Sequence, residues 1–295
     1  MRSEPMVSVV IAAYNMGQYL PQAVNSVLNQ SWGNLEVILI DDGSKDDTEH
    51  KMSAYSEDYR VRYIRTENRG QPKAKNLGVK SARGDFIAFC DADDYWDEDK
   101  LLLQMPEFED DKVGIVYSEV NYVDEVGQPV EKPQPYNRYS GNVTNELLIK
   151  NFVPFGTAVV RRQCFVSNGF FDENLPMGID WDLWLRFSLA WKFKYIPDKT
   201  YFYRVWHGQM STNYRSRYDN AFKILKKFLE ENRGVVSDKL IARAWSDMYS
   251  SKAISLAKSE RIFFEPLVNI IYSIKYDCFY LPAWKSFLKL LFRRP

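Results

Sequence analysis

Three carboxylates stand within four residues directly after a short apolar run of the sequence. The run covers residues 86–90, and Asp91, Asp93 and Asp94 follow it. Carboxylates packed this closely at the end of a buried strand repel one another unless a cation lies among them. Mg²⁺ and Mn²⁺ prefer oxygen ligands of this kind, and they often bridge a protein carboxylate to substrate phosphates. The segment therefore predicts a metal–phosphate site, and the alternative is a solvated acidic loop.

Other polar residues with suitable chemistry follow apolar runs in the same half of the chain. Tyr14 is suited to stack on a base, and Asp42 is suited to accept a hydrogen bond from a base N–H group. Arg69, Lys73 and Lys75 are suited to neutralise phosphate charge. Each has an ordinary alternative, which is a turn for Asp42 and a solvated helix face for the lysines. Only the elements that carry these residues can bring them to one ligand.

The pattern of the first half predicts a sheet that would bring these residues together. Apolar runs rich in β-branched residues occur at 7–13, 35–40, 61–64 and 86–90. Segments with helical spacing separate them, and strands that alternate with helices predict a parallel, doubly wound α/β sheet. The carboxyl ends of its strands meet at one edge, where open α/β sheets bind ligands. We therefore expect the polar residues to lie along that edge.

The later part of the chain changes character. Further strands are predicted at 113–120, 156–161, 193–196 and 201–205, with a helix at 180–190. From about residue 218 the chain is predicted to be helical. Residues 284–294 form a short, amphipathic and basic segment, which suits a helix lying in a membrane interface. The alternative is a packing helix whose Lys and Arg side chains reach out to water.

The bulk composition limits the classes of protein. The 295 residues are 45% hydrophobic, which is enough for a large core. Lys plus Arg and Asp plus Glu number 39 each, so no charge excess favours a nucleic-acid partner. Three widely spaced cysteines indicate reduced thiols. With no recognisable signal peptide and no apolar run of about 18 residues, we expect a cytoplasmic protein, at the inner face of the membrane if the C-terminal segment docks there.

The motifs of the first half occur in a fixed order. They are Ala13-Tyr14-Asn15, Asp41-Asp42-Gly43-Ser44, Asn68-Arg69-Gly70, Lys75-Asn76-Leu77-Gly78 and Asp91-Ala92-Asp93-Asp94. This ordered set resembles the nucleotide-sugar half of family 2 glycosyltransferases with the GT-A fold. The resemblance implies a Rossmann-like, mostly parallel sheet flanked by helices.

The second half carries the resemblance further. Residues 169–173 and 180–186 resemble the acceptor-side motifs, and Tyr203-Arg204 with His207 resembles the motif that closes the domain. The resemblance covers about residues 5–212. It implies a GT-A domain at 1–215, with a nucleotide-sugar half at about 5–110 and an acceptor half at 111–215. A helical C-terminal extension would then occupy residues 216–295.

The resemblance also implies roles for the residues that match its donor-side motifs. Ala13, Tyr14 and Asp42 would hold a uridine-type base, and Asn15 and Arg69 would also bind the nucleotide. The choice of uridine rests on its prevalence in the family.

The diphosphate and its metal would lie near the acidic cluster. Lys75, which stands where the family often has Arg, would be close to the nucleotide, and Asp91 would be close to the ribose. Asp93 would be the direct ligand of Mn²⁺ or Mg²⁺. His207 would bind the metal or the diphosphate, and its alternative is a structural histidine.

The acceptor side would supply the catalytic base. Asp180 aligns with that base, although the family frequently has an acidic residue just before it and here that residue is Ile179. Asp182 is the other candidate, and residues two apart on a helix point to different faces, so only one should face the acceptor. The Trp181 ring would either lie beneath the acceptor sugar or take part in the packing of its helix.

These roles together imply a metal-dependent, inverting glycosyltransferase. It would move a sugar from a nucleoside-diphosphate donor, a UDP-sugar by family prevalence, to a hydroxyl of a glycan or a lipid-linked acceptor. Such a reaction belongs to the biosynthesis of cell-surface polysaccharide or glycolipid. The alternative is a non-catalytic protein that binds nucleotide sugars on the same fold and has lost the base.

Overall fold

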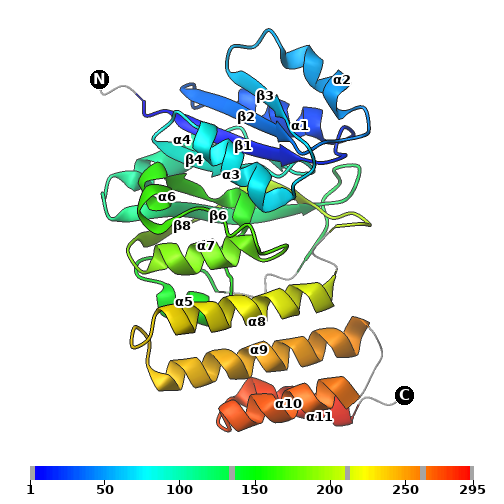
Figure 1. Ribbon diagram of the computed structural model, residues 1–295, viewed down its shortest axis with the longest axis vertical. Coiled ribbons are helices and arrows are strands. Elements are labelled where there is room, and N and C mark those ends of the chain that lie inside the picture. Colours follow the sequence, from blue (N-terminus) through cyan, green and yellow to red (C-terminus); the bar gives the residue numbers. More distant parts are fainter. Residues whose placement is uncertain (1–3, 133–136, 210–212, 260–263, 293–295) are drawn as a thin grey trace. The chain divides into compact units, whose positions relative to one another are not determined.

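The computed structural model describes residues 4–132, 137–209, 213–259 and 264–292. The chain divides into two compact units (Figure 1). The sheet unit lies within residues 1–143 and 152–207, and the helical unit lies within residues 144–151 and 208–295. This division differs from the expected boundary at residue 215, because it falls after His207 and assigns residues 144–151 to the helical unit.

The first half of the sheet unit is a parallel α/β sheet. Its strands are β1 (Val7–Ala13), β2 (Leu35–Asp41), β3 (Val61–Arg65) and β4 (Phe86–Phe89). Strand β1 pairs in parallel with β2 and with β4, and β2 pairs in parallel with β3. Every residue of β2 and nearly every residue of β1 is buried, as the continuous apolar runs predicted.

The second half of the sheet is mixed. It contains β5 (Tyr95–Trp96), β6 (Val113–Val123), β7 (Val159–Arg161) and β8 (Lys192–Arg204). The strand order in the eight-stranded sheet is β3-β2-β1-β4-β7-β6-β8-β5. Strand β7 runs antiparallel to β4 and β6, and β5 runs antiparallel to β8. The sheet is therefore mostly parallel, as predicted, with two reversed strands that the sequence pattern did not distinguish.

Three strand predictions of this half were inaccurate in extent. The two short strands expected at 193–196 and 201–205 are one continuous strand, β8. The strand expected at 156–161 begins later, because a 3₁₀ turn, η3 (Phe155–Thr157), precedes β7. Turn η3 contacts the site, as described below.

Helices flank this sheet (Figure 1). They are α1 (Leu20–Leu28), α2 (Thr48–Met52), α3 (Gln71–Ser81), α4 (Lys100–Gln104), α6 (Arg162–Asn168) and α7 (Ile179–Ser188), with 3₁₀ turns η1 (Ser53–Tyr55) and η2 (Met105–Phe108). Helix α3 packs very closely on β1, since a Cβ atom at Gly78 would lie 2.3 Å from Cγ1 of Val10. This close packing sets the distance between α3 and the sheet.

The helical unit contains α5 (Thr144–Ile149), α8 (Tyr214–Glu231), α9 (Asp238–Ser259), α10 (Phe264–Tyr276) and α11 (Leu281–Leu291). It has its own small core, to which α9, α10 and α11 contribute. Nζ of Lys150, directly after α5, lies 2.5 Å from Oδ2 of Asp247 on α9. Within the described residues, no helix has the length and the apolar character needed to cross a bilayer.

Candidate active site

The three carboxylates after β4 have different environments, and Asp94 is the most deeply buried. Its Oδ2 atom accepts a hydrogen bond of 2.7 Å from the Tyr201 hydroxyl, and its Oδ1 atom accepts one of 2.7 Å from the Arg204 backbone N–H. Burial, and then the charges of Asp93 and Asp91, raise the pKa of Asp94 well above its ordinary value. Both oxygens therefore serve to hold the loop against the end of β8.

Asp93 has one oxygen engaged by an aromatic residue. Nε1 of Trp206 donates a hydrogen bond of 2.8 Å to Oδ2 of Asp93. Burial raises the pKa of Asp93, and the charge of Asp91 raises it further. Among the residues that the structure describes, no side chain donates a hydrogen bond to Oδ1 of Asp93. That oxygen is consistent with a ligand for a cation or a donor group.

Asp91 is paired with a buried lysine. Its Oδ1 atom lies 2.9 Å from Nζ of Lys75, whose side chain is only 4% exposed. The same Nζ lies 3.8 Å from the centroid of the Phe155 ring in η3. The side-chain nitrogen thus combines an ion pair with a cation–π contact at the carboxyl edge of the sheet. The sequence predicted Lys75 near the site, but it did not indicate the part of Phe155.

Arg204 fastens the acidic loop to distant elements. Its Nε atom donates a hydrogen bond of 2.8 Å to the carbonyl oxygen of Asp93, and its Nη2 atom donates one of 2.7 Å to Oε1 of Gln22 in α1. The guanidinium group also lies 4.6 Å from the centroid of the Tyr19 ring. The motif Tyr203-Arg204 was recognised from the sequence, but this structural role of the arginine was not.

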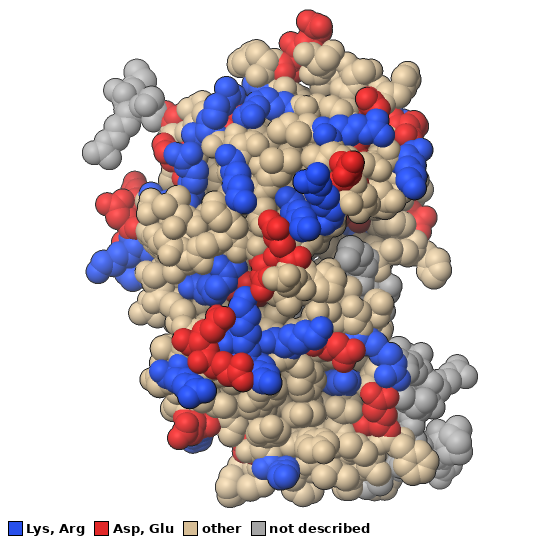
Figure 2. Space-filling view, in the orientation of Figure 1, with Lys and Arg blue, Asp and Glu red and all other residues tan. Residues whose placement is uncertain are grey.

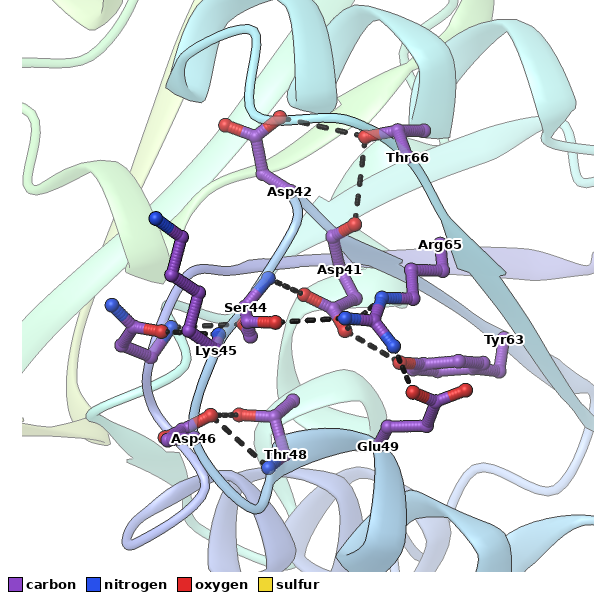
Figure 3. Close-up of polar contacts among 11 residues, drawn as sticks. Asp41, Asp42, Ser44, Lys45, Asp46, Thr48, Glu49, Tyr63, Arg65 and Thr66 are labelled. Carbon is purple, nitrogen blue, oxygen red and sulfur yellow. Dashed lines mark hydrogen bonds and ion pairs between the residues drawn. The ribbon is translucent and has the colours of Figure 1, made fainter.

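The neighbouring carboxylates at the end of β2 diverge (Figure 3). Asp41 accepts hydrogen bonds of 2.5 Å from the Tyr63 hydroxyl and 2.8 Å from the Ser44 backbone N–H. Asp42 points away from these groups and accepts bonds of 2.8 Å each from the backbone N–H groups of Arg69 and Gly70. Asp41 is thus a structural residue, whereas Asp42 joins the β2 loop to the start of α3.

Asp42 also borders a small pocket. The cavity has a volume of about 200 Å³ and is lined by Asp42, Thr66, Arg69, Lys73, Ala74, Asn76, Leu77, Lys80 and Glu173. A carboxylate has about four acceptor positions, so the two backbone bonds leave capacity for a ligand N–H group. The predicted contact of Asp42 with a base therefore stays a prediction.

The segment after β1 is braced against the β2 loop. The carbonyl oxygen of Ala13 accepts a hydrogen bond of 2.8 Å from the Asp42 backbone N–H. Asn15 has a φ of 54° and accepts a bond of 2.8 Å at Oδ1 from the Lys45 backbone N–H. Tyr14 is 41% exposed, so its ring has area available to a ligand. Asn15 thus supports the loop that carries Tyr14.

The side chain and the backbone of Arg69 have different environments. Its side chain is 63% exposed and lies 3.8 Å from Glu67, a weak surface contact. The phosphate-binding role expected for its guanidinium group has no preformed support in this arrangement. Its backbone N–H, in contrast, is held by Asp42.

The acceptor-side helix α7 separates the two candidate bases. Asp182 is buried and accepts hydrogen bonds of 3.0 Å and 2.8 Å from Nε and Nη2 of Arg186. The same arginine donates to the carbonyl oxygens of Asn168 and Phe170. Asp180 is partly exposed, whereas Trp181 is buried. Asp182 thus has a bridging role, and the choice of Asp180 as the base stays a prediction.

Asn76 joins the donor-side helix to the acceptor-side motif at residues 169–173. Its amide nitrogen donates hydrogen bonds of 3.0 Å to the Phe171 carbonyl oxygen and 2.9 Å to Oε1 of Glu173. Its Oδ1 atom accepts a bond of 3.0 Å from the Phe171 backbone N–H. The sequence placed Asn76 in a motif but did not assign it this role.

His207 is exposed, and its backbone N–H donates to Oε1 of Glu125 at 3.2 Å. Its neighbour Trp206, not the histidine, contacts Asp93. Among the residues described, no three His, Cys, Asp or Glu side chains are grouped as a metal site. The pairing of Asp93 with His207 at a metal therefore remains a prediction from the sequence.

Known proteins are similar to this chain in sequence and in fold. The model of glycosyl transferase family 2 matches residues 8–168. A chondroitin synthase of Escherichia coli is 32% identical over 229 residues, which are 76% of this chain and 33% of that protein. A hyaluronan synthase of Pasteurella multocida is 32% identical over 207 residues, which are 69% of this chain and 21% of that protein. The chain spans about a third or less of the length of these relatives.

Solved structures resemble the chain over nearly its whole length. TarS of S. aureus, residues 1–349 in complex with UDP, has a TM-score of 0.66 at 18% identity and covers 98% of this chain and 93% of its own. The mannosyltransferase PcManGT of Pyrobaculum calidifontis, in complex with GDP-Man and Mn²⁺, has a TM-score of 0.63 at 16% identity, covering 100% and 89%. At these identities the likeness shows the fold, while the family match shows membership. The chain belongs to glycosyltransferase family 2, and it has the GT-A fold of that family.

Proposed function

We propose that this glycosyltransferase transfers a sugar from a UDP-sugar to a hydroxyl group of a glycan or a lipid-linked acceptor. The observation that carries the proposal is the arrangement after β4. Asp94 is engaged by the fold, whereas Asp91 and Asp93 lie at the sheet edge with the buried ammonium group of Lys75. Mixed charges of this kind at the carboxyl edge of an α/β sheet suit a diphosphate and its cation.

The donor base is proposed to lie against Tyr14, with Ala13, Asn15 and Asp42 shaping its pocket. The exposure of Tyr14 and the free acceptor capacity of Asp42 support this assignment. A UDP donor is favoured because a structural neighbour is described in complex with UDP and with UDP-GlcNAc. Another neighbour holds GDP-Man, so the choice of base needs the test given below.

A divalent cation, Mn²⁺ or Mg²⁺, fits the residues present. Such ions are commonly held by one or two carboxylates together with substrate phosphates, so a cluster of three protein ligands is not required. Asp93 is the proposed ligand because its carboxylate is partly buried at the sheet edge and has an oxygen to which no side chain of the described residues donates a hydrogen bond. When bound, the cation would stabilise the negative charge of the leaving diphosphate. His207 is retained only as a secondary candidate.

Asp180 is proposed as the general base. Asp182 is less suited to this role because Arg186 holds its carboxylate by two hydrogen bonds. The acceptor hydroxyl would lose its proton to Asp180 as its oxygen bonds to the anomeric carbon. The bond from that carbon to the diphosphate oxygen would break at the same time, and its electron pair would leave with the diphosphate. Attack opposite to the leaving group inverts the anomeric centre.

The class of acceptor is proposed from the relatives. The chondroitin and hyaluronan synthases are named for polysaccharide products, which favours a cell-surface glycan or glycolipid as the product here. The free cysteines Cys90, Cys164 and Cys278 are consistent with a cytoplasmic, reducing compartment.

Donor binding and transfer can be tested separately. Thermal shifts with a panel of UDP- and GDP-sugars, with and without Mn²⁺, should show metal-dependent stabilisation by a UDP-sugar. In Asp93→Ala this stabilisation should be lost. Stabilisation by GDP-sugars alone would overturn the choice of base.

Transfer is then measured with glycan and lipid-linked acceptors. Asp180→Asn should lower the rate by about 10²-fold or more while the donor still stabilises the protein. The exposed Asp198→Asn is the matched control and should keep wild-type activity. Full activity of Asp180→Asn would place the base elsewhere, and donor binding without transfer to any acceptor by the wild-type protein would favour a binding function.

A further inference from the structure

The outward faces of α10 and α11 are apolar. Ten of the twenty exposed large hydrophobic side chains among the described residues lie between residues 264 and 292. They are Phe264, Val268, Ile271, Tyr272, Tyr276, Phe279, Leu281, Trp284, Leu288 and Phe292. Five of them recur along α10 and four along the α11 segment at spacings of three or four residues, which places each set on one side of its helix. The outward side of a surface helix is ordinarily polar, so these helices are unusual.

These side chains are additional to the core of the unit. The inward sides of the two helices are already filled by a separate set, in which Ile270 and Leu290 pack with Ala253 and Ala257 of α9. Hydrogen bonds between serine hydroxyls also join α9 to these helices, such as the 2.9 Å contact of Ser246 with Ser273. Both helices therefore have an inner apolar side that is satisfied and an outer apolar side that faces water.

Among the described residues, the charges on this surface that have no partner are all positive. The carboxylates Glu265 and Asp277 are paired with Arg215 and Arg243. Lys275, Lys285 and Lys289 are exposed, and within residues 213–259 and 264–292 no ion pair engages them. In Figure 2 the part of the surface at the foot of the view is mostly tan, with few charged side chains. The outer face is thus apolar and aromatic, with uncompensated positive charge.

We propose that this face, formed by the ten side chains named above with the three lysines, docks in the interface of an anionic lipid bilayer. Amphipathic helices with aromatic and aliphatic residues on one side and lysines beside them bind there by apolar burial together with attraction to anionic headgroups. Tyr and Trp side chains are favoured at this depth because their rings are apolar and their polar atoms reach water. A second copy of the chain is a poorer occupant, because it would bring like charges together.

This proposal stands apart from donor binding and transfer. The helices would lie in the interface and not cross the bilayer, in line with the lack of a spanning helix in the described part of the chain. A lipid-linked acceptor would be presented at the same surface, but docking does not depend on that acceptor.

The test is co-sedimentation of the full chain with vesicles of phosphatidylcholine alone or with about one third phosphatidylglycerol. We expect binding to the anionic vesicles, weakened by salt, and little binding to the neutral ones. The double variant Phe264→Ser/Phe279→Ser should bind at least about tenfold more weakly, because it removes two large apolar side chains that are 81% and 84% exposed. Lys285→Gln/Lys289→Gln should lose most of the preference for anionic lipid.

The matched control is Val126→Ser, an 80% exposed apolar residue of the sheet unit, which should bind vesicles as the wild type does. Thermal melts and donor-induced stabilisation should be unchanged in all of these variants, so failure of docking is distinguishable from failure of the proposed function. Absence of wild-type binding, or equal binding by the phenylalanine variant, would overturn the proposal. So would a concentration-dependent rise in solution mass that the phenylalanine variant abolishes, because the face would then be an interface between copies.

Discussion

The indole N–H of Trp206 donates a 2.8 Å hydrogen bond to the carboxylate of Asp93, although the two residues are 113 positions apart in the chain. The contact joins the end of β8 to the acidic loop that follows β4. It leaves the other carboxylate oxygen of Asp93 without a side-chain donor in the described residues. Trp206 therefore orients the side chain that we propose as the ligand of the cation.

The Trp206→Phe variant tests this orientation. Phenylalanine keeps an aromatic ring near Tyr19, whose centroid is 6.0 Å from that of Trp206, but it has no N–H group. Leaving this partly buried acceptor unpaired should cost about 1 kcal/mol of unfolding free energy. The Mn²⁺ concentration for half-maximal activity should rise several-fold, because Asp93 is no longer held in one rotamer. An unchanged metal titration would show that Trp206 does not position Asp93.

Removal of the buried charge beside Asp91 should weaken donor binding. Lys75→Met keeps most of the length and apolar volume of the side chain but leaves Asp91 without its cation. We expect the dissociation constant for the nucleotide sugar to rise about tenfold or more, since an uncompensated carboxylate repels a diphosphate. Isothermal calorimetry with the donor measures this. The exposed Lys223→Met serves as the control, and equal affinities in the two variants would contradict the prediction.

Asp182 and Asp180 should give opposite phenotypes. Asp182→Asn disrupts a buried bridge with Arg186 and should lower the free energy of unfolding by about 3 kcal/mol. Asp180→Asn should leave that free energy almost unchanged while abolishing transfer. Urea unfolding and the transfer rate, measured on both proteins, separate the two roles. A stable but inactive Asp182→Asn protein would exchange the assignments.

Lys100 should make stability depend on pH. Its side chain is fully buried, donates to the Thr157 carbonyl oxygen at 2.7 Å, and burial lowers its pKa to about 7. The unfolded chain, with a lysine pKa near 10.5, therefore binds more protons than the folded chain above pH 7, so stability should rise with pH. The rise should be clearest between pH 7 and 9, because the raised pKa of Cys90 opposes it at higher pH.

The measurement is the free energy of unfolding of the wild type and of Lys100→Met across that range. As pH rises, the free energy of unfolding of the wild type should increase relative to that of Lys100→Met. Parallel curves would mean that Lys100 does not titrate on unfolding in this window.

The close packing of α3 on β1 can be tested with a second substitution that relieves the overlap made by the first. A Cβ atom added at Gly78 would overlap Cγ1 of Val10, so Gly78→Ala should cost about 2 kcal/mol. The second change Val10→Ala removes the overlapping methyl groups, and the double variant should lose less than the sum of the two single losses. Strict additivity in a double-mutant cycle of unfolding free energies would argue against the overlap.

The sequence predicted the donor edge of the sheet well because its signals are local. The apolar runs at β1, β2 and β4 are continuous, and each ends in polar residues at the position where the strand ends. The reversed strand β7 could not be distinguished, because three residues of β-branched and charged type carry no information on direction. No feature of the sequence indicated that α5 belongs with the helical unit, because α5 joins it through Lys150, a contact across 97 positions of the chain.

The chemistry of individual site residues was harder to predict. The carboxylates of Asp41 and Asp42 are adjacent and identical in type, and only their partners show that one supports the loop and the other joins it to α3. The same holds for Asn15, whose contact with the neighbouring loop was not predicted, while its expected contact with the nucleotide stays a prediction. Such roles depend on long-range contacts, which residue type and spacing do not encode.

The hydrogen bonds of Asn76 bear on where the chain can be truncated. The segment that matches the family model ends at residue 168, whereas the partners of the buried Asn76 amide are Phe171 and Glu173. A chain that ends at residue 168 would lack all three of these hydrogen bonds, and water would have to take the place of Phe171 and Glu173. The limits of the family match therefore do not coincide with the limits of the contacts that hold α3. A fragment meant to preserve the donor edge should extend at least through Glu173.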